Sequence, residues 1–193
     1  REVYATSGPR IAVRTYGGLN LSPTVLETPG FPGSIQTQAV PMGGEIMGAG
    51  AGDRFSLAIE AQADPKSGYL DRIQVVKGWI DATGETRERV YDAAWSGDDR
   101  LQPDGSLAAV GSSVDLKTGL TANTIGSPRL TAVWQDPEFD PAQSAFYYVR
   151  VLQIPTARHS LLDKLALGDE EIDTRRPDTI QERAYTSPIW YRP

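Results

Sequence analysis

The chain has 193 residues, of which 39% are hydrophobic and 23% charged, and this balance favours a folded domain with its own core over a disordered segment. A formal net charge of −6, with no basic cluster larger than Arg175-Arg176, argues against a nucleic-acid partner. The lack of cysteine excludes disulfides and thiol nucleophiles, and no apolar run approaches the ~20 residues that span a bilayer.

The first residues are interpreted as the end of something longer. The chain opens at Arg1 without an initiating Met or a signal-peptide pattern, and Arg1 to Ala5 is read as the last turn of a helix. Residues 1–9 are therefore predicted to be the tail end of an upstream domain. After a Gly8-Pro9 break, residues 10–193 are predicted to form one β-sandwich domain.

Alternation of apolar and polar residues, the signature of strands, begins at Ile11 and Val13 and is clearest over residues 55–63. Turn residues follow over 64–68, and a second apolar alternation covers 71–80. Because a short turn joins two alternating segments, we expect 55–63 and 71–80 to pair as an antiparallel hairpin.

Four further strands are predicted, over residues 86–95, 129–134, 146–153 and 184–191. In the third of these, Tyr147, Val149 and Val151 share one face. The last contains Pro188, which lacks a backbone N–H to donate, so we expect an edge strand or a bulge there.

Helix is a minor component. The best candidate is Ser160 to Leu167, with Ser160 as its cap and Gly168 as its terminator, and residues 140–143 suit a single turn. About seven short strands separated by turns are typical of a β-sandwich. We therefore predict a mostly-β fold, an antiparallel β-sandwich with long loops and one or two short helices.

Three connections are longer than a compact sandwich needs: 17–40, 97–124 and 155–178. Loops beyond ~12–15 residues are usually functional or packed on another part of the protein. The first is rich in Gly and Pro, and we expect it to lie against the upstream domain.

Few residues suggest catalysis. His159 is the only histidine, it has no G-x-S-x-G elbow to accompany it, and a capping or solvent-facing role is expected. Without cysteine, a zinc site would need three carboxylates, so no metal site is predicted. The glycine-rich run 48–53 lacks the Lys-Ser/Thr of a phosphate loop and precedes a strand, which indicates a connector.

Acidic residues offer two alternatives, both weighed against simple solvation. Asp98, Asp99 and Asp104 supply oxygen ligands in one loop, but their spacing does not match a calcium-binding EF-hand. A glycosidase-like couple could be drawn from four other carboxylates, although their spacing does not require it. These four are Glu60, Asp81, Glu85 and Asp92.

The tryptophans have two interpretations. All four (Trp79, Trp95, Trp134 and Trp190) lie at the ends of predicted strands, where bulky rings close a sandwich core. The alternative is an exposed sugar-binding platform, which exposure of Trp79 or Trp190 would favour.

Six stretches together carry a family resemblance. They are REVYATSGPRI at the start, VPMGGE at 40–45, GYLDRIQVVKGWIDATGE at 68–85, VYDAAWSGD at 90–98, QDPEFDPAQSAFYYVRVLQIPT at 135–156 and QERAYTSPIWY at 181–191. The chain resembles the carboxy-terminal part of a bacterial family of unknown function. Full-length members of that family resemble PHP (polymerase and histidinol phosphatase) metal-dependent phosphoesterases.

The resemblance implies a non-catalytic accessory β-sandwich that packs on a metal-binding barrel of the same polypeptide. None of the family's presumed metal-ligand motifs occurs here, so we expect no catalytic, metal or cofactor residue in this chain. An interface with the upstream domain is predicted at Tyr4, Ile11, Pro41 and Met42. We expect a soluble bacterial protein, periplasmic or cytoplasmic, whose small-molecule ligand is undefined.

Two functions from other classes remain open at this point. One is an independent carbohydrate- or polymer-binding module, and the other is a stand-alone hydrolase built on paired carboxylates.

Overall fold

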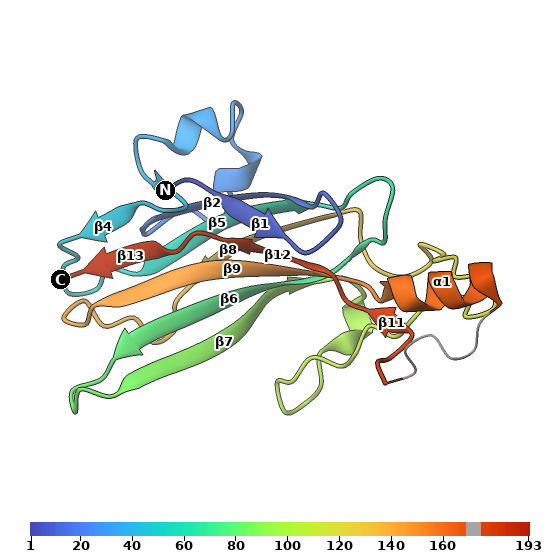
Figure 1. The fold of residues 1–193 in the computed structure, drawn as a ribbon. Coiled ribbons are helices and arrows are strands. Elements are labelled where there is room, and N and C mark those ends of the chain that lie inside the picture. The colour runs from blue at the N-terminus through green and yellow to red at the C-terminus, as the bar shows by residue number, and fades with distance from the viewer. Residues whose placement is uncertain (169–174) are drawn as a thin grey trace.

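The computed structural model describes residues 1–168 and 175–193, and within these ranges most of the chain is strand. The larger sheet has seven strands and lies along one side of the molecule (Figure 1). These are β1 (Tyr4–Thr6), β4 (Glu45–Met47), β6 (Leu70–Ile80), β7 (Thr86–Trp95), β9 (Ala145–Gln153), β12 (Arg183–Thr186) and β13 (Ile189–Arg192).

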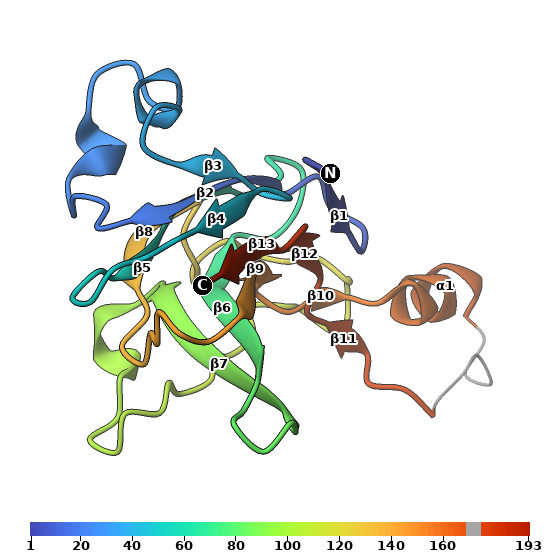
Figure 2. The ribbon, with the colours of Figure 1, turned by 90° about the vertical axis from the view of Figure 1, so that its left-hand side faces the viewer.

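The smaller sheet has four strands in the order β3-β2-β5-β8 and packs on the larger one (Figure 2). Its members are β2 (Ala12–Leu19), β3 (Val40–Pro41), β5 (Phe55–Gln62) and β8 (Arg129–Gln135). Side chains from the facing sides of both sheets form one apolar cluster that includes Phe55, Ile73, Val149 and Ile189. The fold is therefore sandwich-like, as predicted.

The larger sheet is organised around β9. One edge of β9 pairs with β6, and β6 continues to β7. The other edge pairs with β12 along one half and with β13 along the other, and the chain breaks between them at Ser187-Pro188. The predicted single strand 184–191 is thus two strands, and neither is an edge because β1 flanks β12 and β4 flanks β13.

The predicted hairpin of 55–63 with 71–80 is wrong. Both segments are strands, but β5 pairs with β2 and β8 in the smaller sheet, whereas β6 pairs with β7 and β9 in the larger one. The intervening residues 63–69 carry the chain from one layer to the other. A short polar connection fits both geometries, so local turn chemistry did not distinguish them.

The long connection 17–40 packs on its own sheet. Leu21, Val25 and Ile35 are buried in a second apolar cluster against Tyr16 and Ala58, on the side of the smaller sheet opposite the main core. The strand β5 is consequently buried on both faces rather than half-buried. The apolar side chains that were expected to meet another domain are covered by this chain itself.

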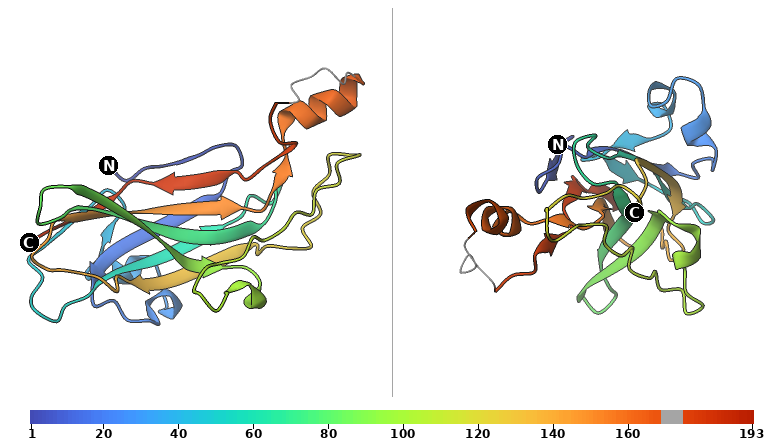
Figure 3. Two further views of the ribbon diagram at one scale, coloured as in Figure 1. Left: turned by 90° about the horizontal axis from the view of Figure 1, so that it is seen from below. Right: turned by 90° about the vertical axis from the view of Figure 1, so that its right-hand side faces the viewer.

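A nine-residue helix, α1 (His159–Leu167), stands off one end of the sandwich beside the short ribbon of β10 (Thr156–Ala157) and β11 (Thr179–Ile180) (Figure 3). It ends at Gly168 in the left-handed conformation, as predicted, but its N-cap is Arg158 and not Ser160. The 155–178 connection contains this helix, and its residues 169–174 lie outside the described ranges.

The predicted helical turn at Arg1 to Ala5 is also wrong. Residues 4–6 form β1, which pairs antiparallel with β12, and the backbone N–H of Ser187 donates to the carbonyl of Val3. The assignment of residues 1–9 to an upstream domain stays a prediction, but in this structure they complete the edge of the larger sheet.

Candidate functional site: an aromatic groove

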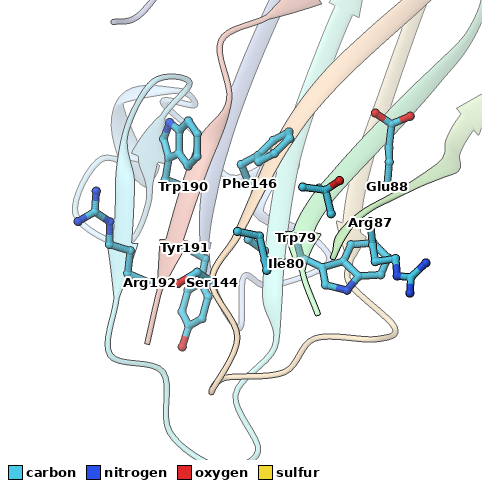
Figure 4. Close-up of a pocket in the computed structure, with 12 residues that line it drawn as sticks. Trp79, Ile80, Arg87, Glu88, Ser144, Phe146, Trp190, Tyr191 and Arg192 are labelled. Atoms are coloured by element: carbon cyan, nitrogen blue, oxygen red, sulfur yellow. The ribbon is translucent and has the colours of Figure 1, made fainter. Parts of the chain in front are cut away.

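A groove of about 600 Å³ crosses one end of the larger sheet (Figure 4). Its walls combine apolar side chains with a few polar ones. The apolar group is Trp79, Ile80, Phe146 and Trp190, and the polar group is Thr86, Arg87, Glu88, Ser144 and Arg192. This volume lies within the ~300–1,000 Å³ range typical of small-molecule sites, and the mixed lining is also typical of them.

Strand register explains why these residues meet. Glu88 lies opposite Gly78, Gly78 opposite Phe146, and Phe146 opposite Trp190. The four residues therefore form one row across β7, β6, β9 and β13. Because side chains alternate between faces, this row points away from the core that Tyr147 and Ile189 enter from neighbouring positions.

Gly78 fixes the position of the Phe146 ring. A Cβ atom at Gly78 would lie 2.2 Å from Cζ of Phe146, so the ring occupies the space above the glycine that a side chain would otherwise fill. The same ring packs against Trp190, with centroids 5.4 Å apart and planes inclined by 51°. The two rings form an inclined aromatic surface, and Trp190 remains 44% exposed.

The cations of the groove are held by carboxylates. Arg87 donates from Nε to Asp81 at 2.7 Å and from its terminal nitrogen to Glu85 at 2.6 Å, while Arg192 pairs with Glu45. A hydrogen bond from the Thr83 hydroxyl, followed by that from Arg87, lowers the pKa of Asp81 below its ordinary value.

Glu88 differs from the other carboxylates around the groove. Within the described ranges it has no hydrogen-bond or ion-pair partner. A carboxylate without a partner at the rim leaves acceptor capacity for a ligand.

A buried charged pair lies on the core side of the same strands. Nζ of Lys77 donates to Asp136 at 2.6 Å and to the carbonyl of Glu138 at 2.9 Å, and the Tyr147 hydroxyl donates to the same Asp136 oxygen at 2.7 Å. Nζ also lies 5.2 Å from the Trp79 ring centroid. Burial, then the charge of Asp136, raises the pKa of Tyr147. This packed set joins β6, β9 and the segment after β8.

The four carboxylates considered for a glycosidase couple do not form one. Glu60 lies between Arg14 and Arg129, Asp92 is held by Arg72 and Gln74, and Asp81 and Glu85 share Arg87. Each carboxylate is therefore engaged by at least one guanidinium group, and no two of them face each other across a cleft as a glycosidase couple requires.

The remaining sequence candidates are dispersed. His159 is exposed at the first residue of α1, and Asp104 accepts hydrogen bonds from the backbone and hydroxyl of Ser106. The run 48–53 connects β4 to β5, as predicted. Within residues 1–168 and 175–193, no three His, Asp or Glu side chains gather as a metal site.

The tryptophans divide between the two interpretations. Trp79 and Trp134 pack against the main core and Trp95 is half-buried, but Trp190 points to solvent because β13 alternates buried and exposed residues. Expecting all four in the core was wrong for Trp190. The outward aromatic positions of β9 and β13, Phe146 and Trp190, were the sequence signal for the groove.

The predicted interface residues fall into two groups. Ile11 is fully buried and Met42 is 5% exposed, so neither offers surface to a partner, whereas Tyr4 is 45% exposed and Pro41 is half-buried. Tyr4 and Met42 line one small cavity of about 180 Å³, which shares no lining residue with the aromatic groove. The interface itself stays a prediction.

Of three comparisons with known proteins, one finds a match. Residues 1–193 match the model of a family described as Protein of unknown function (DUF3604). No curated protein and no solved structure matches the chain. Separately, among the described residues, no helix has the length and apolar character to cross a bilayer. Because the match covers the whole sequence, the chain belongs to the DUF3604 family.

Proposed function

We propose that this chain is a non-catalytic accessory β-sandwich domain of a longer, PHP-like metal-dependent hydrolase, and that it binds a ligand through the aromatic groove. The domain would contact its neighbour in the polypeptide through the Tyr4 side and leave the groove accessible. The resemblance of the six sequence stretches supports the first part of this proposal.

The exposed ring of Trp190 is the observation that carries the binding role. A large aromatic side chain gains free energy when it leaves water, at roughly 25 cal/mol per Å² of apolar surface. Here Trp190 stays 44% exposed beside a Phe146 ring that a glycine positions. Exposed aromatic surface within a cavity of ligand size is typical of a recognition site.

The state of the acidic residues supports binding rather than acid–base chemistry. A general acid needs a carboxyl group whose pKa is raised towards neutrality. Among the described residues, each Asp or Glu whose pKa departs from the ordinary value is shifted downwards by hydrogen bonds; these are Asp53, Asp64, Asp81, Asp104 and Glu138.

An assay of two proteins tests the proposal. The 193-residue chain and the longer polypeptide that contains it are incubated with bis(p-nitrophenyl) phosphate and Mn²⁺, Mg²⁺ or Zn²⁺. We expect hydrolysis by the longer polypeptide alone, together with a His-x-His segment and further His and Asp clusters upstream of Arg1. Hydrolysis by the 193-residue chain would refute the non-catalytic role, and an upstream region without those clusters would refute the accessory one.

A second candidate is an independent carbohydrate- or polymer-binding module, which the exposure of Trp190 also favours. The two candidates differ at Tyr4, which an accessory domain covers with its neighbour. Iodination of Tyr4, read by mass spectrometry in the chain and in the longer polypeptide, separates them. Protection in the longer polypeptide supports the accessory domain, and equal labelling supports the independent module.

A further inference from the structure

The aromatic groove presents two kinds of surface that a sugar ring matches. The C–H groups on one face of a pyranose carry slight positive charge and pack on the negative face of an aromatic ring. Phe146 and Trp190 pack against each other, with ring centroids 5.4 Å apart and planes inclined by 51°, and together offer one aromatic surface to such a face. Because Gly78 sets the Phe146 ring in place, the surface exists before a ligand arrives and little ordering is lost on binding.

The polar rim matches a ligand that both donates and accepts hydrogen bonds. Glu88 only accepts, and the N–H groups of Arg192 that Glu45 does not use only donate. Both side chains are exposed at the rim, so an apolar occupant would gain no hydrogen bond from them, whereas a hydroxylated one would. Hydroxyl groups satisfy both, since each one donates and accepts.

The charges around the groove disfavour an anionic ligand. Four carboxylates lie at or beside the groove (Glu45, Asp81, Glu85 and Glu88), against the guanidinium groups of Arg87 and Arg192. This excess of negative charge opposes phosphate, sulfate or uronate groups. A charged group of either sign that spans the groove would meet a like charge, because Arg87 and Arg192 lie on opposite sides of it with their paired carboxylates beside them (Figure 4).

We propose that the groove binds a neutral pyranose ring of a short oligosaccharide, stacked on Trp190 and Phe146, with its hydroxyl groups held by Glu88 and Arg192. The inference rests on the ligand-binding part of the proposed function and names the ligand class. The inference depends on the inclined rings of Phe146 and Trp190 and on the acceptor Glu88 and donor Arg192 at the rim.

Isothermal titration calorimetry with three neutral probes, cellohexaose, maltohexaose and chitohexaose, tests the proposal. Fully deacetylated chitosan hexamer and hexagalacturonate serve as the cationic and anionic comparisons. We expect at least one neutral probe to bind and the charged probes to bind more weakly. Truncating a central aromatic residue of a binding site commonly costs about tenfold or more in affinity, so Trp190→Ala should lose at least that.

Tyr185→Ala is the matched control. Tyr185 is a 36%-exposed aromatic residue on the same face of the larger sheet, packed on Tyr148 and outside the groove, so its removal should leave affinity unchanged. Circular dichroism confirms that both variants fold. The proposal is overturned if no neutral hexasaccharide binds, if Trp190→Ala binds as tightly as wild type, or if only a charged probe binds. Such a result leaves the accessory role to its own phosphoester assay.

Discussion

Replacing Lys77 by Met removes the ammonium group and keeps most of the side-chain stem. Lys77 and Asp136 are 2% and 1% exposed, so the variant leaves the carboxylate of Asp136 buried with only the Tyr147 hydroxyl and the Glu138 backbone N–H as donors. Breaking a buried ion pair on one side costs about 3–5 kcal/mol. In a domain of this size each kcal/mol lowers Tm by roughly 2–4 °C, so we expect a fall of about 6–20 °C.

Urea and thermal unfolding, followed by circular dichroism, measure this cost. The double variant Lys77→Met with Asp136→Asn removes both charges and keeps a side-chain oxygen at position 136 that can accept from the Glu138 backbone N–H. It should therefore recover much of the lost stability. Arg14→Met is the control, because the Arg14–Glu60 pair is exposed on the arginine side and such pairs contribute about 0–1 kcal/mol. A Lys77→Met cost no larger than the Arg14→Met cost would refute the reasoning.

Three further predictions concern the aromatic surface of Phe146 and Trp190, the 17–40 connection and the buried Tyr147. Gly78→Ala places a methyl group against Phe146, so we expect it to lower the free energy of unfolding by about 1–3 kcal/mol, to alter the near-ultraviolet circular dichroism spectrum and to weaken ligand binding. An unchanged spectrum and affinity would contradict the aromatic surface that Phe146 and Trp190 form. Ile35→Ala should cost about 2–5 kcal/mol in urea unfolding if the 17–40 connection is packed on its own sheet, whereas exposed Leu120→Ala should cost almost nothing. The pKa of Tyr147 is raised in the fold above its ordinary value of 10.0, so its contribution to stability is complete below pH 10 and declines as pH rises above it. Urea midpoints at pH 8 and pH 11 should therefore fall at the higher pH by less in Tyr147→Phe than in wild type.

Local patterns predicted the strands well and their partners poorly. The alternation over 55–63 and 146–153 correctly predicted β5 and β9, since the period of side chains along a strand follows from the backbone alone. Pairing depends on contacts far apart in sequence. The short segment 63–69 could return the chain beside β5 or carry it to the other sheet, and only the packing of both sheets decides.

Burial on the second face of a sheet was equally non-local. The sequence of β5 alternates as if one face met water, but Ile35 and its neighbours in the 17–40 connection cover that face. A Gly- and Pro-rich loop gives no sign of where its few apolar side chains pack.

The groove was only partly predictable. Trp190 was considered as a platform residue, and its neighbours on β9 were recognised as alternating, which places Phe146 outward. Register across β7, β6, β9 and β13, which aligns Glu88, Gly78 and Phe146 with Trp190, cannot be obtained from one sequence.

The tryptophan indole N–H signals in a ¹H–¹⁵N spectrum test the central claim, that the groove is the binding surface, most directly. The chain has four tryptophans, of which Trp79 and Trp190 line the groove and Trp95 and Trp134 do not. Titration with the three neutral hexasaccharides should shift the Trp190 signal, with a smaller change at Trp79, and leave the other two in place. Signals that all stay fixed, or shifts confined to Trp95 and Trp134, would contradict the account.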